Sequence, residues 1–317
     1  MSYTLVADIG GTYTRLARLQ GDRQPVDTET YSNSAFSDFA DILDQFLAAQ
    51  SSRPAEIGLA VAGPVYNHSV TMTNLGWTIS ARSLAAKFSI PRVAVINDFA
   101  AIAWATIALR SADLFQVGGG MSQSNANRGV IGPGTGLGVG GLIATNGDWA
   151  ALASEGGHVT MPAGNSEESS LIAAVTAEFG HCSAERLLSG PGLVRIHTLL
   201  GGHECPPEEI TRLAQGGEPA ALNTVDTFCS MLGTVAGNLA LTLGARGGIY
   251  LAGGIIPAIS DLLEASRFRA RFEAKGRFYE YLKSIPTFVI MRPNPSFVGL
   301  GICLRSTRDK AATNSDS

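Results

Sequence analysis

The chain has 317 residues, of which 45% are hydrophobic and 16% charged, a composition typical of a globular protein of roughly two domains. Its 23 lysines and arginines against 27 acidic residues give a net charge of −4, which disfavours nucleic acid or an anionic membrane surface as the main partner. Four cysteines in a chain of this length are typical of reduced cytosolic thiols, and the opening residues MSYTLVADIGG do not form a signal peptide. We therefore expect a cytoplasmic protein.

The N-terminal third alternates between predicted strands and predicted helices. Three apolar runs have the character of strands, the first of them a hairpin around a Gly-Gly turn: residues 4–20, 57–65 and 93–98. Residues 37–49 place five apolar side chains on one helical face after Ser37 as the N-cap, and a second helix follows at residues 99–110. Strands that alternate with helices indicate an α/β fold.

The rest of the chain repeats this organisation and then becomes mainly helical. After a loop at residues 118–128, residues 129–146 repeat the strand, glycine-rich turn and strand of residues 4–20. We interpret this as a second lobe, although two unrelated hairpins would have the same spacing. The further predicted elements are helices at 166–180, 183–188, 220–243, 256–266 and 299–308, and a strand at 247–254. The apolar run 228–245 contains Asn238 and is followed by Arg246, so we predict a buried helix and no membrane span.

Two glycine-rich turns are candidate phosphate sites, because glycine lets backbone N–H groups approach a phosphate closely. They are Asp8-Ile9-Gly10-Gly11-Thr12 and the turn at residues 134–138. In the first turn, a carboxylate at the strand end can reach Mg²⁺ directly or through water, while the amides and the Thr12 hydroxyl face phosphate. Ordinary hairpins use the same residues, so either turn alone is also consistent with a plain hairpin.

Other nucleotide-binding motifs are excluded or disfavoured. There is no Gly-Lys dipeptide, which excludes a P-loop of the Walker A kind. Residues 136–141 match the spacing of a dinucleotide fingerprint, but the residues after them favour a strand rather than the required helix.

Several polar residues lie where ligand groups are often found. Asn97-Asp98 follows a buried strand, which suits either a ligand group or a helix N-cap. Glu155 and His158 flank two glycines and could bind the hydroxyls of a polyol, or form an ordinary loop. Glu185 could be a ligand group or a first-turn acid stabilised by the helix dipole. The basic residues between 267 and 283 are interleaved with acids, which favours a solvated face.

Taken together, nine segments in one order, from about Tyr3 to Leu304, resemble the bacterial glucokinase family, the group without a zinc site. They are ADIGGTYTRLA, AVAGPV, MTNLGW, VINDF, GPGTGLGV, SEGGHV, SAERLLSGPGL, GNLALTLGARGGIYLAGGI and KGRF. The resemblance implies an α/β fold of the two-lobed actin-like (hexokinase) type, with the active-site cleft between a small lobe of residues 1–109 plus 300–317 and a large lobe of residues 110–299. Hinges are expected near residues 108–112 and 298–302.

The resemblance also implies an activity, an ATP-dependent glucokinase that makes glucose 6-phosphate. It makes Asp98 the general base that takes the proton of the glucose 6-hydroxyl. The sugar-binding positions that match are Asn97, Asp98, Glu155, His158 and Glu185, with Gly136 beside them. The nucleotide-binding positions that match are Ala7, Asp8, Ile9, Gly10, Gly11, Thr12, Gly134, Thr135, Gly253 and Gly254, and Asp8 is the expected Mg²⁺ ligand. The implied substrates are glucose and ATP, and the family implies a homodimer.

Two features of the sequence bear on these expectations. Tyr13 stands where the family usually has asparagine after Gly-Gly-Thr, so nucleotide affinity and donor choice are open. Arg15 matches a phosphate-side arginine, which either contacts phosphate or braces the strand.

The alternatives are a kinase for another hexose or another phosphoryl donor, and a non-catalytic sugar-binding protein or regulator. Repressors related to sugar kinases carry a helix-turn-helix domain ahead of the kinase-like lobes. Asp8 lies seven residues after Met1, which leaves no room for such a domain, so we do not expect a repressor.

Overall fold

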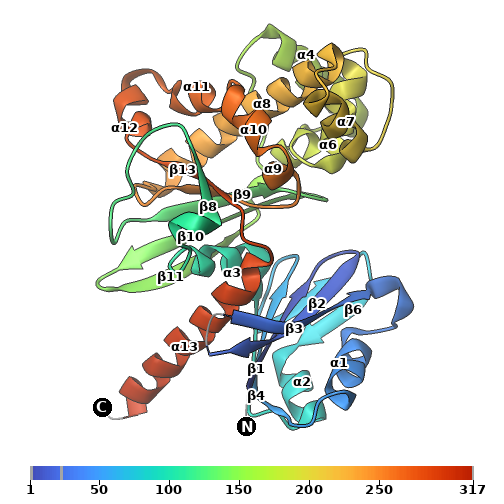
Figure 1. Cartoon of the computed structure of the whole chain (residues 1–317), viewed down its shortest axis with the longest axis vertical. Coiled ribbons are helices and arrows are strands. Elements are labelled where there is room, and N and C mark those ends of the chain that lie inside the picture. The colour runs from blue at the N-terminus through green and yellow to red at the C-terminus, as the bar shows by residue number, and fades with distance from the viewer. Residues whose placement is uncertain (1–2, 22–23, 316–317) are drawn as a thin grey trace. The chain divides into compact units, whose positions relative to one another are not determined.

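A computed structural model describes residues 3–21 and 24–315, with side chains up to residue 308 (Figure 1). Residues 1–2, 22–23 and 316–317 of the predicted small lobe lie outside the described residues. The chain divides into two compact units, one formed by the residues up to Leu109 and from Arg292 onward, the other by Arg110–Met291. The second predicted lobe boundary, at residues 299 and 300, falls inside the C-terminal helix α13 (Pro295–Ser315).

The first unit is a five-stranded sheet with helices on both faces. Its elements are β1 (Tyr3–Ile9), β2 (Tyr13–Gln20), β3 (Gln24–Ser32), η1 (Asn33–Ala35), α1 (Phe39–Ala48), β4 (Pro54–Val61), β5 (Ser69–Met72), β6 (Trp77–Ser80), α2 (Ala81–Phe88), β7 (Arg92–Asn97), α3 (Asp98–Ala105) and α13. The strand order is β3-β2-β1-β4-β7, with β5 and β6 forming a separate hairpin.

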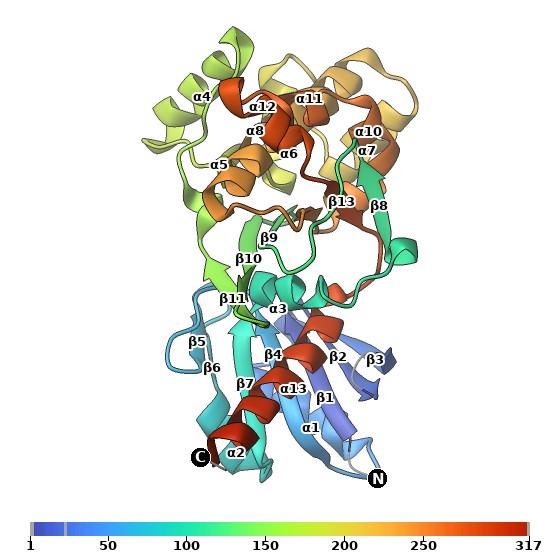
Figure 2. The ribbon, with the colours of Figure 1, turned by 90° about the vertical axis from the view of Figure 1, so that its left-hand side faces the viewer.

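The two faces of this sheet follow from the alternation of side chains along its strands. Leu5, Ala7 and Ile9 of β1 pack with α1 and α2, whereas Val6 packs with α3 and with Phe297 of α13. Figure 2 shows α13 crossing this second face. Asp8, two residues after Val6, therefore lies on the α13 face of the sheet.

The second unit contains the larger sheet and most of the helices. Its elements are η2 (Ser111–Asp113), β8 (Leu114–Val117), β9 (Arg128–Pro133), β10 (Leu137–Thr145), β11 (Asp148–Ser154), η3 (Gly156–His158), α4 (Ser166–Phe179), α5 (Ala184–Leu187), α6 (Gly190–Leu199), α7 (Pro207–Gln215), α8 (Pro219–Leu243), β12 (Ile249–Leu251), α9 (Ile255–Ala258), α10 (Ser260–Ala265), α11 (Phe268–Glu273), η4 (Gly276–Phe278), α12 (Tyr279–Lys283) and β13 (Thr287–Ile290).

The predicted repeat is confirmed in the topology. The second sheet has the order β11-β10-β9-β12-β13, followed by β8. In both units an antiparallel hairpin is extended on one side by a third antiparallel strand and on the other by two parallel strands. The glycine turns 10–12 and 134–136 therefore occupy equivalent positions in two sheets with the same topology.

Several sequence predictions for individual elements need correction. The N-cap of α1 is Asp38 and not Ser37, whose hydroxyl instead donates to Asp41 Oδ2 at 2.7 Å. The single helix predicted at 256–266 is broken at Ile259, where the backbone turns (φ −117°, ψ 22°) and keeps the Ile259 side chain in the core.

The basic stretch near residues 267–283 is not simply a solvated face. Arg269 Nε donates to Glu273 Oε1 at 2.6 Å, and Arg271 Nη2 donates to Glu168 Oε2 at 3.1 Å. The side chains of Arg269 and Arg271 are only 13% and 18% exposed, so this part of the stretch is an internal ion-pair network.

The long helix and the cysteines agree with the sequence analysis. Helix α8 is buried at every residue from 227 to 237. No helix within residues 3–21 and 24–315 has the length and apolar character needed to cross a membrane. Cys182, Cys229 and Cys303 are buried, Cys205 is partly exposed, and none of the four is in a disulfide.

Candidate active site

The first glycine turn joins β1 to β2 through Gly10, Gly11 and Thr12. The Gly10 N–H donates to the Tyr13 carbonyl at 3.0 Å and closes the turn. A Cβ at Gly11 would lie 2.8 Å from the side-chain amide nitrogen of Asn74, so glycine permits this close approach. Gly11 and Thr12 are exposed, which leaves the tip of the turn accessible to a ligand.

Asn33 braces this turn from η1. It is 2% exposed, its Nδ2 donates to the Gly10 carbonyl at 2.8 Å, and its Oδ1 accepts from the Thr14 hydroxyl at 2.8 Å. Its backbone N–H donates to the Thr12 carbonyl at 2.9 Å. One buried amide therefore holds both sides of the turn, and the sequence analysis missed it because an isolated asparagine in a loop carries no motif.

Asp8 lies behind the turn, near the carboxyl end of β1. Its Oδ2 accepts a hydrogen bond of 2.7 Å from the Ser296 hydroxyl at the start of α13, and Arg15 is its register partner on β2. Burial raises the pKa of the Asp8 carboxyl above its ordinary value, while the Ser296 hydrogen bond and the Arg15 charge lower it. Ala7 and Ile9 bury their side chains in the sheet, so only their main-chain groups remain for a ligand.

The donor set at Asp8 suits a magnesium ion that arrives with a nucleotide. Mg²⁺ in phosphoryl-transfer sites is usually held by one or two carboxylates together with waters and substrate phosphates. Asp8 provides one carboxylate, and no cluster of three or more His, Cys, Asp or Glu side chains in the described part of the chain could hold a metal alone. The residues present therefore fit Mg²⁺ bound as part of Mg-ATP.

Asn97 and Asp98 lie at the same edge of the first sheet as the glycine turn. The registers pair Ile9 with Val61 and Val61 with Asn97. Neighbouring strands are about 4.8 Å apart, so β1 and β7, with β4 between them, are about 10 Å apart. The carboxylate of Asp98, the residue after β7, is thus about 10 Å from the glycine turn along this edge.

The structure resolves which of these two residues caps α3. Asn97 Oδ1 accepts from the Ala100 N–H at 3.0 Å, and Asn97 Nδ2 donates to the Gly63 carbonyl at 3.3 Å. Asn97 is therefore the N-cap and is 7% exposed. Asp98 is the first residue of the helix, partly exposed, and its Oδ1 accepts from the Phe99 N–H at 2.9 Å.

In the second unit, two acids flank one imidazole. His158 Nε2 lies 3.9 Å from Glu155 Oε2, and His158 Nδ1 lies 3.9 Å from Glu185 Oε1. The side chains of His158 and Glu155 are 60% and 53% exposed, while that of Glu185 is 33% exposed. These three residues form an open polar cluster of acceptors around a ring that can donate.

Glu185 connects this cluster to the second glycine turn. Its Oε2 accepts from the Leu137 N–H at 2.9 Å, and a Cβ at Gly136 would lie only 2.4 Å from the same oxygen. The interpretation of Glu185 as only a first-turn acid stabilised by its own helix is therefore incomplete. Its carboxylate accepts a hydrogen bond from a residue 48 positions away.

A short backbone pairing brings the cluster together. The Met161 N–H donates to the Cys182 carbonyl at 2.9 Å, and the Ala184 N–H donates to the Val159 carbonyl at 2.8 Å. This pairing ties the segment after His158 to the segment before Glu185. Nothing in the sequence pattern indicates it.

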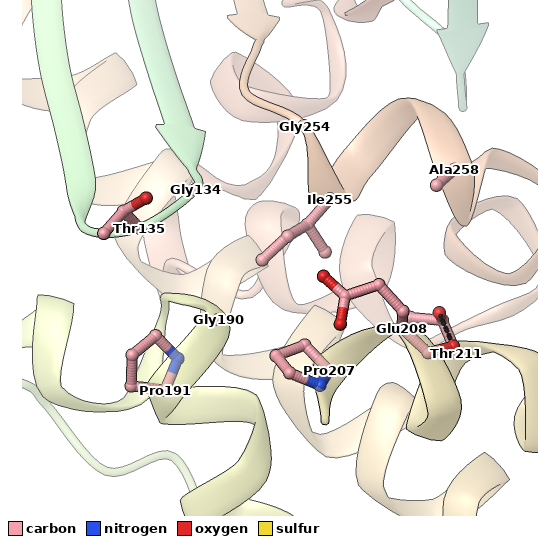
Figure 3. A pocket seen from close by; sticks show the side chains of 10 residues that line it. All are labelled: Gly134, Thr135, Gly190, Pro191, Pro207, Glu208, Thr211, Gly254, Ile255 and Ala258. Atoms are coloured by element: carbon pink, nitrogen blue, oxygen red, sulfur yellow. Dashed lines mark hydrogen bonds between the residues drawn. The ribbon is translucent and has the colours of Figure 1, made fainter. Parts of the chain in front are cut away.

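The second glycine turn borders a cavity of about 410 Å³ (Figure 3). The Gly134 N–H donates to the Gly136 carbonyl, and the Gly190 N–H donates to the Gly134 carbonyl, both at 2.8 Å. Gly253 has φ +86°, and a Cβ there would lie 2.3 Å from the Pro133 carbonyl oxygen. Gly134, Thr135 and Gly254 line the cavity, so two of the segments predicted to bind the nucleotide meet in one place.

Solved structures with the same architecture define the class of protein. The crystal structure of a glucokinase from an Antarctic psychrotroph matches 96% of this chain and 99% of its own, with a TM-score of 0.86 and 34% identity. A ROK family glucokinase from Streptomyces griseus, solved in complex with glucose and AMPPNP, matches 95% of this chain and 98% of its own, with a TM-score of 0.66 and 20% identity. The fold is that of the two-lobed, actin-like sugar kinases, which confirms the predicted fold class.

Sequence comparison identifies the family within that class. The model of the glucokinase family, described as "Glucokinase", matches residues 5–307. The glucokinase of Nitrobacter hamburgensis is 42% identical over 305 residues, covering 93% of this chain and 95% of that protein. The chain belongs to the glucokinase family of hexose kinases, as its nine motifs predict.

Proposed function

We propose that the chain transfers the γ-phosphoryl group of ATP to the 6-hydroxyl of D-glucose, giving glucose 6-phosphate and ADP. The observation that carries this proposal is the bond from Leu137 N–H to Glu185 Oε2. It joins an acid suited to sugar hydroxyls to a glycine turn suited to phosphate. A site that handles a polyol and a phosphate together fits a sugar kinase better than a plain sugar-binding protein.

Asp98 is the proposed general base. Its Oδ1 is held by the Phe99 N–H, which fixes the orientation of the carboxylate. The carboxylate takes the proton from the 6-hydroxyl as the oxygen attacks the γ-phosphorus in line with the departing ADP. A positioned base of this kind contributes about 10²- to 10⁴-fold to the rate.

The proposed sugar contacts divide by chemistry. Glu155 and Glu185 accept hydrogen bonds from glucose hydroxyls, and His158 donates to one of them. Asn97 adds an amide from the first unit, and Gly136 keeps the space beside Glu185 free of a side chain. Leaving one of these groups unpaired after bound sugar has excluded water from it costs about 1–3 kcal/mol, which is the proposed source of discrimination against other hexoses.

The proposed nucleotide contacts come from glycine turns. Backbone N–H groups of residues 10–12 and of Gly134 and Thr135 face the phosphates, and Gly253 and Gly254 border the adenosine. Asp8 would hold a Mg²⁺ ion that arrives with the nucleotide, directly or through water, and the ion would supply positive charge to the phosphates. The Ser296 hydroxyl donates to the Asp8 carboxylate, and the positive charge of Arg15 favours its ionised form.

The residues of this site are distributed over both units of the chain. The proposal therefore requires that the lobes close around glucose and ATP, with hinges near residues 108–112 and 298–302. A homodimer, a cytoplasmic location and the absence of nucleic-acid or membrane partners remain our predictions.

A substrate panel tests the proposed function. Purified protein would be assayed for phosphorylated sugar with Mg-ATP and glucose, mannose, fructose or N-acetylglucosamine, and then with glucose and ADP or polyphosphate as donor. We expect turnover with glucose and ATP to exceed every other pair. Preference for another hexose or donor would replace the proposed substrate, and no turnover with any pair would favour a binding-only role.

A further inference from the structure

The cavity beside the second glycine turn contains one charged side chain among its described lining residues, that of Glu208. The other lining residues are glycines, prolines, Ala258, Ile255 and two threonines. A carboxylate in a cavity that borders a phosphate turn is unexpected, because it repels a polyanion unless another part of the ligand compensates.

The Glu208 carboxylate has no partner within the part of the chain that the structure describes. No hydrogen bond or ion pair of this carboxylate occurs among the described residues, and only the Glu208 backbone carbonyl is engaged, by the Thr211 hydroxyl at 2.8 Å. The adjacent acid behaves differently, because Glu209 Oε1 and Oε2 bind Arg212 at 2.6 and 2.7 Å. The two neighbours therefore form a matched pair, one acid with a partner and one without.

The position of the carboxylate indicates what it would bind. In Figure 3 the Glu208 side chain points toward the space between Ile255 and Pro207. Gly134 and Thr135 lie on one side of this space and Ala258 on the other (Figure 3). A nucleoside triphosphate places its ribose between its phosphates and its base, so a nucleotide whose phosphates meet Gly134 and Thr135 brings its ribose toward the middle of the cavity.

We propose that the Glu208 carboxylate accepts hydrogen bonds from the ribose hydroxyls of the donor nucleotide and selects ribonucleotides over deoxyribonucleotides. This inference rests on the proposed function, because it assumes that the donor is a nucleotide bound in this cavity. A carboxylate is an acceptor only, and the vicinal 2′- and 3′-hydroxyls of ribose are two donors on adjacent carbons. Losing a hydrogen bond to a charged group corresponds to about a 10-fold loss of affinity.

Because Glu208 is charged, the proposal predicts the direction in which ATP affinity changes when the charge is removed. If the carboxylate binds ribose, Glu208→Gln weakens ATP binding. If it only faces the polyanion, the same change relieves repulsion and strengthens ATP binding. Glu209→Gln removes a charge at the adjacent position and controls for the general electrostatic effect.

The experiment measures kcat and KM with saturating glucose for the wild-type protein, Glu208→Gln and Glu209→Gln. The donors are ATP, 2′-deoxyATP, 3′-deoxyATP and GTP. We expect the wild-type protein to prefer ATP over either deoxy form about 10-fold. In Glu208→Gln the KM for ATP should rise by up to about 10-fold and this preference should fall, because a neutral amide binds the hydroxyls less strongly than a carboxylate, with the GTP-to-ATP ratio and the KM for glucose unchanged. Glu209→Gln should behave like the wild-type protein.

Three results would overturn the proposal: a lower KM for ATP in Glu208→Gln, an unchanged ribose preference, or a change confined to the GTP-to-ATP ratio. If the wild-type protein does not phosphorylate glucose with ATP, the proposed function fails separately. Calorimetric titration of the same proteins with ATP and the deoxy forms then decides the ribose contact, and absence of any ATP binding would overturn it too. Glu208 is exposed, so Glu208→Gln should unfold at the same temperature as the wild-type protein.

Discussion

The two glycine turns occupy equivalent places in two sheets of the same topology, yet different chemistry braces them. The turn at residues 10–12 is held by the neutral amide of Asn33, and the Asp8 carboxylate behind it is bonded to Ser296. The turn at residues 134–136 is held by Gly190 and is followed by Leu137, whose N–H bonds the Glu185 carboxylate. The first design places an acid where we propose a metal binds, whereas the second couples the proposed phosphate turn to an acid that we propose binds the sugar.

The largest expected difference in activity between the two turns follows from substituting their glycines. A Cβ at residue 136 would meet the Glu185 carboxylate at 2.4 Å, and one at residue 11 would meet the terminal amide of the Asn74 side chain at 2.8 Å. The Asn74 side chain can rotate away, but Glu185 is fixed by Leu137. Gly136→Ala should lower kcat/KM for glucose about 100-fold or more, and Gly11→Ala less than about 10-fold. If both substitutions lowered kcat/KM equally in steady-state assays, the difference that we assign to the two turns would be wrong.

We expect the ionised Asp8 carboxylate to lower the stability of the fold while supporting activity. Because burial makes its folded-state pKa higher than its unfolded-state pKa, ionised Asp8 destabilises the fold at neutral pH. This cost disappears as the pH falls through the raised pKa toward the unfolded value of about 3.9. Asp8→Asn should therefore unfold at a higher temperature than wild type at pH 7.5, with kcat/KM reduced about 100-fold or more.

Thermal unfolding of both proteins between pH 4 and pH 8 measures the stability part of this prediction. The difference between them should shrink toward pH 4. A difference that does not depend on pH would show that ionisation of Asp8 is not the cause.

The smallest expected effect concerns Tyr13, at the start of β2. Tyr13 is 48% exposed and alternates with the buried Thr14, so it shares the face of Arg15 and Asp8. A phenol beside the phosphate turn crowds a nucleotide, so Tyr13→Asn should lower the KM for ATP about 3-fold, or roughly 0.6 kcal/mol. The free energy of unfolding should change by less than about 0.5 kcal/mol. A higher KM for ATP, or a changed KM for glucose, would show that the tyrosine is used differently.

Much of the fold could be predicted because its signals are local. The hairpin at residues 4–20, the glycine turns and the apolar strands at 57–65 and 93–98 depend on residues close together in the chain, and the repeat of spacing indicated two sheets of one design. The strand predicted to end at residue 65 ends at Val61, which shows that the ends of an element are harder to predict than its presence.

The supporting contacts of the site could not be predicted, because they join distant residues without a motif. Ser296 bonds Asp8 across 288 positions, and Asn33 bonds the first turn from a loop of unremarkable composition. Residues 159–161 pair with residues 182–184 through backbone groups, which every residue possesses. The sequence therefore indicates candidate site residues, but not the contacts that hold them in place.

The most direct test of the proposed phosphoryl transfer to glucose is the turnover of Asp98→Asn, measured together with its affinity for glucose. Asparagine keeps the size and a hydrogen-bonding oxygen of the side chain but cannot take the proton. If Asp98 is the base, kcat falls about 10²- to 10⁴-fold while the Kd for glucose, measured by calorimetry, stays within a few-fold of the wild-type value. An unchanged kcat, or a loss of glucose binding that accounts for the whole loss of activity, would contradict this mechanism.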